Sequence, residues 1–204
     1  MAESLVQVTE GSGKKLHTWS RTVGANTVED EVVVHGEPFL ATYVVAGSGS
    51  AATITSHWQL MAGASLNVYV RRISVFQTVA ATTAAIVPWT LQRLSTAGTG
   101  GTSATPAPYD TSDAASGATF MSLPTAKGTE TGVVVGTRYA YMEQTIPASQ
   151  APGPTLIAEW LFNNLRGKSL RIAAGAANGI AVSNRAAVAG ASVVVEIEFT
   201  EASY

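Results

Sequence analysis

Alternation of apolar and polar residues with a period of two is the feature that most limits the folds open to this chain. It is clearest in SVVVEIEFTE, residues 192–201, where one parity holds the apolar residues Val193, Val195, Ile197 and Phe199. Successive side chains of a strand point to opposite faces of a sheet, so this segment predicts a strand with one buried and one solvated face.

Eight further segments share strand-like composition and are separated by turn signals such as GSGS, PGP and GAANG. They span residues 38–45, 52–61, 66–76, 85–94, 132–146, 155–162, 169–174 and 179–184. Shorter extended pieces are expected at residues 6–8 and 31–35. We find no convincing amphipathic helix. Many short strands joined by Gly-rich turns favour an all-β sandwich or barrel.

Two positions predict irregular strands. In LNVYVRRISVF the apolar parity changes at Arg71 and Arg72, which predicts a β-bulge or a bend. Pro88 lies inside another strand segment, and proline cannot donate a hydrogen bond to a ladder. We therefore expect that segment to be an edge strand or to carry a bulge.

Composition narrows the possible partners. Only 13% of the residues are charged, against about 25% in typical proteins, so we expect partners to cover part of the surface. A net charge of -2 argues against nucleic acid as a partner. Cysteine is absent, which excludes disulfides and thiolate chemistry. Neither a signal peptide nor a membrane-spanning run is visible, and we expect no membrane partner.

Residues capable of chemistry are few, and each has a plainer explanation. His17, His35 and His57 lack the spacing of a metal site. Glu143 and Glu159 could form a glycosidase-like acid pair, but solvated strand glutamates are far more common.

Asp110 and Asp113 could ligate calcium, although closure of their own turn is the favoured interpretation. The sequence therefore predicts a protein that is not an enzyme, with no catalytic residue, cofactor or metal.

Aromatic residues offer two kinds of binding surface. Trp58, Trp89 and Trp160 could stack on sugars, although packing in the core is the commoner use of such residues. Tyr139 and Tyr141 share one parity of a predicted strand, and as an outward-facing pair they are candidates for a subunit interface.

The segment STAGTGGTSATPAPYDTSDAASGAT, residues 95–119, has the composition of a linker. Predicted strands flank it on both sides, which makes residues 95–118 a long loop inside one sandwich. Because Pro106, Pro108 and Tyr109 supply stiffness and an anchor, we expect an ordered loop packed on its own sheet or across a subunit contact.

Three stretches of the chain resemble virion structural proteins of tailed bacteriophages with jelly-roll domains. These stretches are LQRLSTAGTGGTSATPAPYDTSDAASGATFMSLP, GTRYAYMEQT and SLRIAAGAANGIAVSNRAAVAGASVVVEIEFTE. The resemblance covers roughly residues 38–201. It implies a single jelly-roll-like antiparallel β-sandwich at residues 36–204, preceded by an extended arm at residues 1–35 that adds to a neighbour's sheet edge.

The same resemblance implies a role without catalysis. The expected function is that of a capsid decoration or cement protein, assembled as a homotrimer in the host cytoplasm and bound to the major capsid protein or to neck and tail proteins of the virion. The alternative is a tail- or fibre-associated module that recognises carbohydrate or protein on the host surface.

Overall fold

The computed structural model describes residues 18–23, 26–31, 40–55, 57–144, 154–162 and 169–203. The chain divides into two compact units, Met1–Phe39 and Leu40–Tyr204. In the first unit β1 (Thr18–Val23) pairs antiparallel with β2 (Asn26–Glu31), a hairpin that the sequence patterns did not predict. Predicted extended residues 6–8 and 32–35 lie outside the described residues, as do His17 and His35.

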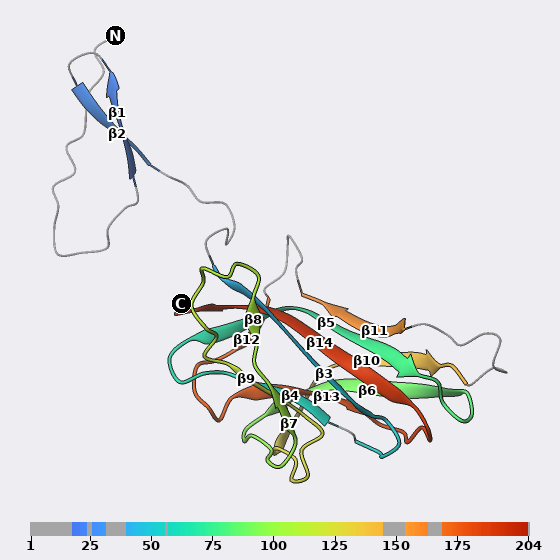
Figure 1. Ribbon diagram of the computed structural model, residues 1–204. Coiled ribbons are helices and arrows are strands. Elements are labelled where there is room, and N and C mark those ends of the chain that lie inside the picture. The colour runs from blue at the N-terminus through green and yellow to red at the C-terminus, as the bar shows by residue number, and fades with distance from the viewer. Residues whose placement is uncertain are drawn as a thin grey trace. The chain divides into compact units, whose positions relative to one another are not determined.

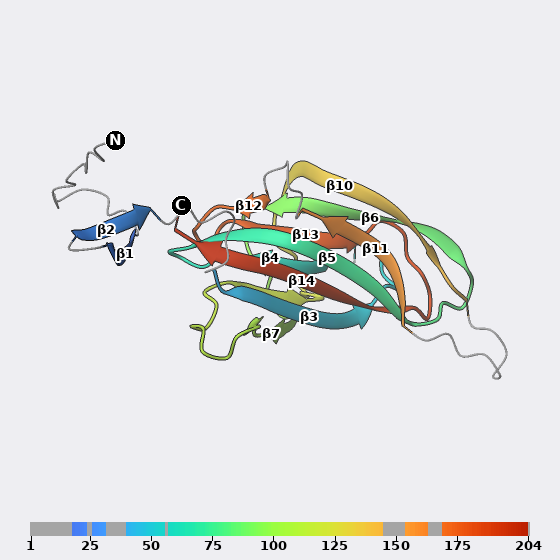
Figure 2. The same cartoon turned by 90° about the horizontal axis from the view of Figure 1, so that it is seen from above.

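The second unit is a sandwich of two antiparallel sheets, and Figure 2 shows the strands of one sheet overlying those of the other. The first sheet has the order β11-β5-β14-β3-β8, with β12 paired to β5. Its strands are β3 (Thr42–Ser50), β5 (Asn67–Val79), β8 (Ala107–Pro108), β11 (Thr155–Leu161), β12 (Leu170–Ile172) and β14 (Ser192–Ala202).

The second sheet has the order β10-β6-β13-β4-β9-β7 (Figure 1). Its strands are β4 (His57–Met61), β6 (Ala85–Leu94), β7 (Thr102–Ala104), β9 (Thr119–Ser122), β10 (Glu130–Met142) and β13 (Gly179–Asn184).

This strand order is that of a jelly roll. Leaving aside the short strands β7, β8, β9 and β12, the first sheet holds β3, β5, β11 and β14, and the second holds β4, β6, β10 and β13. The chain therefore crosses to the other sheet after every strand except β6, which is followed by β10 in the same sheet. The inner strands pair as β11-β5-β14-β3 and β10-β6-β13-β4, which is the arrangement of two Greek keys folded into a double sheet. The predicted all-β jelly-roll sandwich is therefore confirmed.

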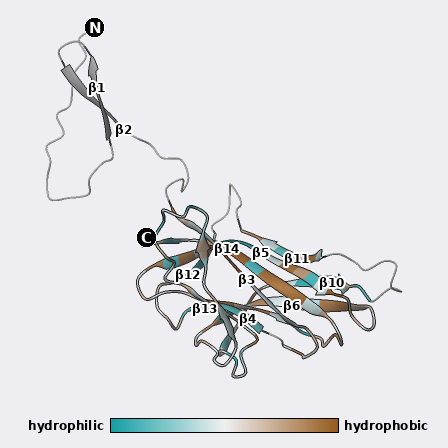
Figure 3. Cartoon of the chain, in the orientation of Figure 1, coloured by the Kyte–Doolittle hydropathy of each residue, from teal (hydrophilic) through white to brown (hydrophobic). Residues whose placement is uncertain are grey.

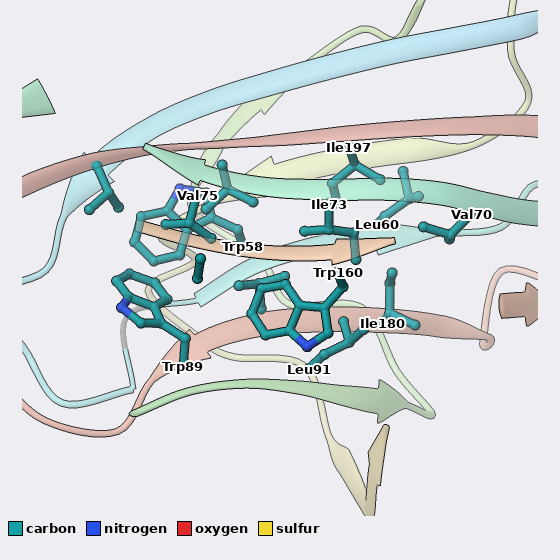
Figure 4. Packing of buried hydrophobic residues seen from close by; sticks show 14 of the residues in the cluster. Trp58, Leu60, Val70, Ile73, Val75, Trp89, Leu91, Trp160, Ile180 and Ile197 are labelled. Carbon is teal, nitrogen blue, oxygen red and sulfur yellow. The ribbon is translucent and has the colours of Figure 1, made fainter. Parts of the chain in front are cut away.

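The core lies between the two sheets and follows from the period-two pattern (Figures 3 and 4). On β14 all four apolar residues of the predicted buried parity are fully buried. Trp58 and Trp89 pack with ring centroids 5.8 Å apart. Trp160 is also buried, so none of these three rings can stack on a sugar, and core packing is their use.

The two predicted irregularities have different outcomes. Glu198 pairs with Arg72 and Phe199 with Val70, so Arg71 is an extra residue and the predicted bulge is confirmed. Pro88 lies opposite Tyr139 without a register shift, on a strand flanked by β10 and β13. The strand is therefore neither an edge strand nor bulged at Pro88, and both alternatives predicted for it are wrong.

Proline is tolerated here because the ladder with β13 ends at the next residue, Trp89. The Pro88 carbonyl instead accepts a hydrogen bond from the Arg185 N–H at 2.7 Å. N–H and C=O of one residue point to the same side of an antiparallel strand, so the nitrogen of Pro88 faces Arg185, one residue beyond the last pair of that ladder.

The segment between β6 and β10 folds along the edges of both sheets. Its strand β8 pairs with β3 at the edge of the first sheet, and β9 and β7 extend the second sheet beyond β4. The Tyr43 hydroxyl donates to the Ala114 carbonyl at 3.0 Å. The Glu201 carboxylate accepts from the Ser116 hydroxyl and from the N–H groups of Gly117 and Ala118. Residues 95–118 therefore lie on the sheets of their own chain.

Candidate interaction surface

A group of exposed apolar residues lies on the outer face of the second sheet, on β10 and β6. Ala140 and Met142 point into the core, so Tyr139 and Tyr141 point outward, with 75% and 60% of their surface exposed. Tyr141 lies opposite Ile86, which is 69% exposed, and Tyr139 lies opposite the half-buried Pro88. We call Ile86, Pro88, Tyr139 and Tyr141 the tyrosine face.

Further exposed apolar residues lie elsewhere on β10 and on β11, the edge strand of the first sheet. Val133 and Val134 on β10 are at least half exposed, as is Leu161 on β11, and Leu156 is nearly so. The two strands are joined by Arg138, whose Nε donates to the Glu159 carbonyl at 3.1 Å. Leu161 lies opposite Arg72, so it belongs to the outer face of the first sheet. The cross-strand neighbours of the tyrosine face form an exposed apolar group, which is typical of a surface that binds another protein.

The outer face of the first sheet carries a group of charged and polar residues on β5, β11 and β14. Arg72 forms ion pairs with Glu196 at 3.1 Å and with Glu198 at 3.4 Å. The Ser74 hydroxyl lies 3.4 Å from the Glu159 carboxylate, to which it donates. The two faces of the sandwich therefore differ: these ion pairs lie on the outer face of the first sheet, and the tyrosine face lies on the outer face of the second.

The strand edges show the same asymmetry. Within the described residues, β3 and β4 are covered by β8 and by β9 with β7, while β10 and β11 have a partner strand on one side only. Open edges attract other chains, and bulges commonly protect them. Register shifts between Glu130, Val134 and Gly136 interrupt the first half of β10. We therefore expect contacts on this side to use side chains of the tyrosine face more than continuous strand pairing.

The other predicted interface residues lie away from the tyrosine face. Pro106 is buried within its own chain, and Pro108 is half-buried in β8 opposite Tyr43. Tyr109 is 57% exposed. Partial burial and the nearby Glu198 carboxylate raise the pKa of its hydroxyl. Because β8 and β10 lie at opposite ends of the two sheet orders, the structure does not bring Tyr109 together with Tyr139 and Tyr141.

The candidate catalytic and metal residues have structural partners. Asp110 accepts hydrogen bonds from the Ser112 N–H at 2.9 Å and hydroxyl at 2.7 Å, which confirms turn closure and lowers the pKa of its carboxyl group. No group of three potential metal ligands occurs among the described residues.

The two candidate acidic residues are also separate. The backbone of Glu143 bonds to the side chain of Gln77, whose strand partner is Thr155. Glu159 lies four residues further along the same strand, roughly 13 Å at the rise of a β-strand. Its carboxylate faces Ser74 on the outer side of the first sheet.

A buried polar layer, which the sequence patterns did not reveal, lies under the segment that joins β6 to β10. His57, Ser183 and Thr90 are opposite one another on three neighbouring strands, and all three are buried. Gln59 binds the backbone of Gly98 in both directions, which fastens the segment over this layer.

Neither ring nitrogen of His57 has a hydrogen-bonding partner among the described residues. The pKa of His57 is lowered to about 4, mainly by burial and further by the positive charges of Lys127 and Arg185. The side chain of Gln59 acts in the opposite direction and raises it. His57 is therefore a neutral, structural residue at neutral pH.

Comparisons with protein-family models, with curated proteins and with solved structures find no match for this chain. Among the described residues, no helix has the length and apolar character needed to cross a membrane.

Proposed function

We propose that this protein is a non-enzymatic structural component of a tailed-phage virion, a capsid decoration protein that acts by assembling with copies of itself and binding the capsid. The observation that carries the proposal is the tyrosine face, an exposed apolar surface on one side of a jelly roll whose other side is covered by its own chain. The phage context comes from the sequence resemblance alone.

The proposed occupant of the tyrosine face is a second copy of the chain, and the resemblance favours three copies. Covering a tyrosine buries about 150–250 Å² when the whole ring is accessible. At exposures of 75% and 60%, Tyr139 and Tyr141 together supply about a third of the roughly 800 Å² that each partner contributes to a standard interface. Ile86 and Val134 extend the same surface toward that area.

Size-exclusion chromatography with light scattering tests the assembly. We expect the mass of a small oligomer of the 21.0 kDa chain, and a mass near that of one chain for the double variant Tyr139→Ser, Tyr141→Ser. Ile54→Ser is the matched control, because Ile54 is 57% exposed in a turn outside the tyrosine face. An unaltered monomer for the parent chain would contradict self-assembly through this face.

Co-sedimentation with separated phage heads and tails tests the location. Binding to heads supports decoration of the capsid, whereas binding to tails alone supports the alternative of a tail- or fibre-associated recognition module. That alternative has lost its proposed sugar platform, since Trp58, Trp89 and Trp160 are buried. A monomer without affinity for either part would refute the virion proposal.

A further inference from the structure

A groove of about 520 Å³ opens where β6 ends and β10 begins, beside the turn between β12 and β13. Arg93 and Arg171 line it together with Thr131 and Asn178. The rest of its wall is largely apolar, from Leu94, Val133, Ile172 and Ala173. None of the described residues that line the groove is acidic, so together they carry a positive formal charge.

Among the described residues, the two arginines of the groove have no carboxylate partner, unlike the arginines that form ion pairs elsewhere in the sandwich. Arg72 pairs with Glu196 and Glu198, and Arg185 with Glu130. Among the described residues, the side chain of Arg93 contacts only a carbonyl and that of Arg171 only an amide oxygen. A partly buried guanidinium without a counter-charge is costly, and burial lowers the pKa of Arg93.

Both side chains are held in place by their own hydrogen bonds. Arg171 Nη2 donates to Asn67 Oδ1 at 3.0 Å, and the same oxygen accepts the Ala174 N–H at 3.0 Å. Asn67 is buried, so it gives Arg171 a fixed support. Arg93 Nη1 donates to the Arg171 carbonyl, which links the two arginines. A guanidinium has five N–H donors, so each arginine keeps several for a ligand.

From this geometry we infer that the groove binds an oxyanion, the carboxylate or phosphate group of a small organic ligand whose body lies on the apolar wall. The planar guanidinium fork matches the paired oxygens of both groups. The side chains of Arg93 and Arg171 bind the anion, Asn178 and Thr131 add polar contacts, and Leu94, Val133 and Ile172 contact the body of the ligand. This inference does not rest on the proposed role in a virion.

Titration of the ¹⁵N-labelled protein followed by NMR tests the site with two probes. Sodium benzoate presents a carboxylate on an apolar body, and inorganic phosphate presents the oxyanion alone. We expect saturable shifts of the amides of Arg171, Ala173 and Gly179, with benzoate saturating below about 10 mM. Sodium chloride at equal ionic strength is the control for screening.

Arg93→Gln and Arg171→Gln should each weaken binding at least tenfold, because each removes a charge-assisted contact. Arg138→Gln is the matched control. Among the described residues the Arg138 side chain, like that of Arg93, donates only to backbone carbonyls, but it does not line the groove. If Arg171→Gln loses its dispersed spectrum, Arg93→Gln alone provides the test.

Saturation by either probe with loss in the groove variants supports the site. Benzoate alone would assign a carboxylate with an apolar body, and phosphate alone would assign the oxyanion without the apolar wall. Shifts that follow ionic strength for both probes, or that persist unchanged in both groove variants, would overturn the inference.

Discussion

Protonation of His57 is expected to destabilise the sandwich in mild acid. The folded protein holds the pKa of this residue at about 4, whereas an unfolded histidine titrates near 6.5. Between these values the unfolded chain binds more protons than the folded chain, so the free energy of unfolding decreases as pH falls. The contribution is complete above about pH 6.5 and is lost progressively down to about pH 4.

The size of this effect follows from the two pKa values. A difference of about 2.5 units corresponds to about 3 kcal/mol once the pH is well below 4, of which about 2 kcal/mol is already lost at pH 5. Since typical domains have a net stability of only about 5–15 kcal/mol, a loss of this size is readily measured.

Urea unfolding of the parent protein and of His57→Phe from pH 7.5 to pH 4 measures the effect. Carboxylates elsewhere contribute equally to both proteins, so the difference between the two curves isolates His57. Phenylalanine cannot titrate, and it replaces a ring whose nitrogens have no partner among the described residues. Parallel curves, or a His57 ring that titrates near pH 6.5 by NMR, would show that His57 is not desolvated in the folded state.

Three further substitutions test other contacts. Glu201→Ala removes the acceptor of three hydrogen bonds that hold the segment 116–118, and urea unfolding should show a loss of about 3 kcal/mol of stability. An unchanged midpoint would mean that these hydrogen bonds contribute nothing to stability. Gly47→Ala places a Cβ 2.5 Å from the ring of the buried Phe120, so thermal unfolding should show a loss of about 1–3 kcal/mol of stability. Unchanged stability would mean that the Phe120 ring can move aside freely. Asp110→Ala affects only an exposed turn, so a loss much above about 1 kcal/mol in the same assay would contradict its assignment as turn closure.

Period-two patterns were sufficient to predict the main strands. The segments 85–94 and 179–184 form β6 and β13 with the predicted bounds, because their buried residues alternate or form a short apolar run between clear turns. The bulge at Arg71 was also predictable, since an inserted residue changes the parity of the residues that follow it.

The short strands β7, β8 and β9 were not predictable in the same way. Strands of two to four residues contain too few positions to establish a period. In addition, β3 and β4, the partners of β8 and β9, lie far away in sequence. For Pro88 the error has another cause. Its tolerance depends on where a neighbouring strand ends, which is a tertiary property.

The candidate sites also contain some features that could be predicted from the sequence and others that depend on the tertiary structure. The outward direction of Tyr139 and Tyr141 follows from strand parity, so it could be predicted from the sequence. Arg93 on β6 and Arg171 on β12 are 78 residues apart and belong to different sheets, and only the folding of the jelly roll brings them together. The burial of His57 depends in the same way on a covering segment that is distant in sequence.

The segment 95–118 is ordered although its composition supplies little apolar surface. Its order depends instead on fixed acceptors and donors of the sandwich, above all the Glu201 carboxylate, the Tyr43 hydroxyl and the Gln59 amide. These contacts hold the segment against the β3 and β4 edges, where it satisfies backbone groups that would otherwise be open to other chains. A jelly roll protected in this way on one side has its apolar, uncovered surface on the other, and that is why we assign assembly to the β10 side.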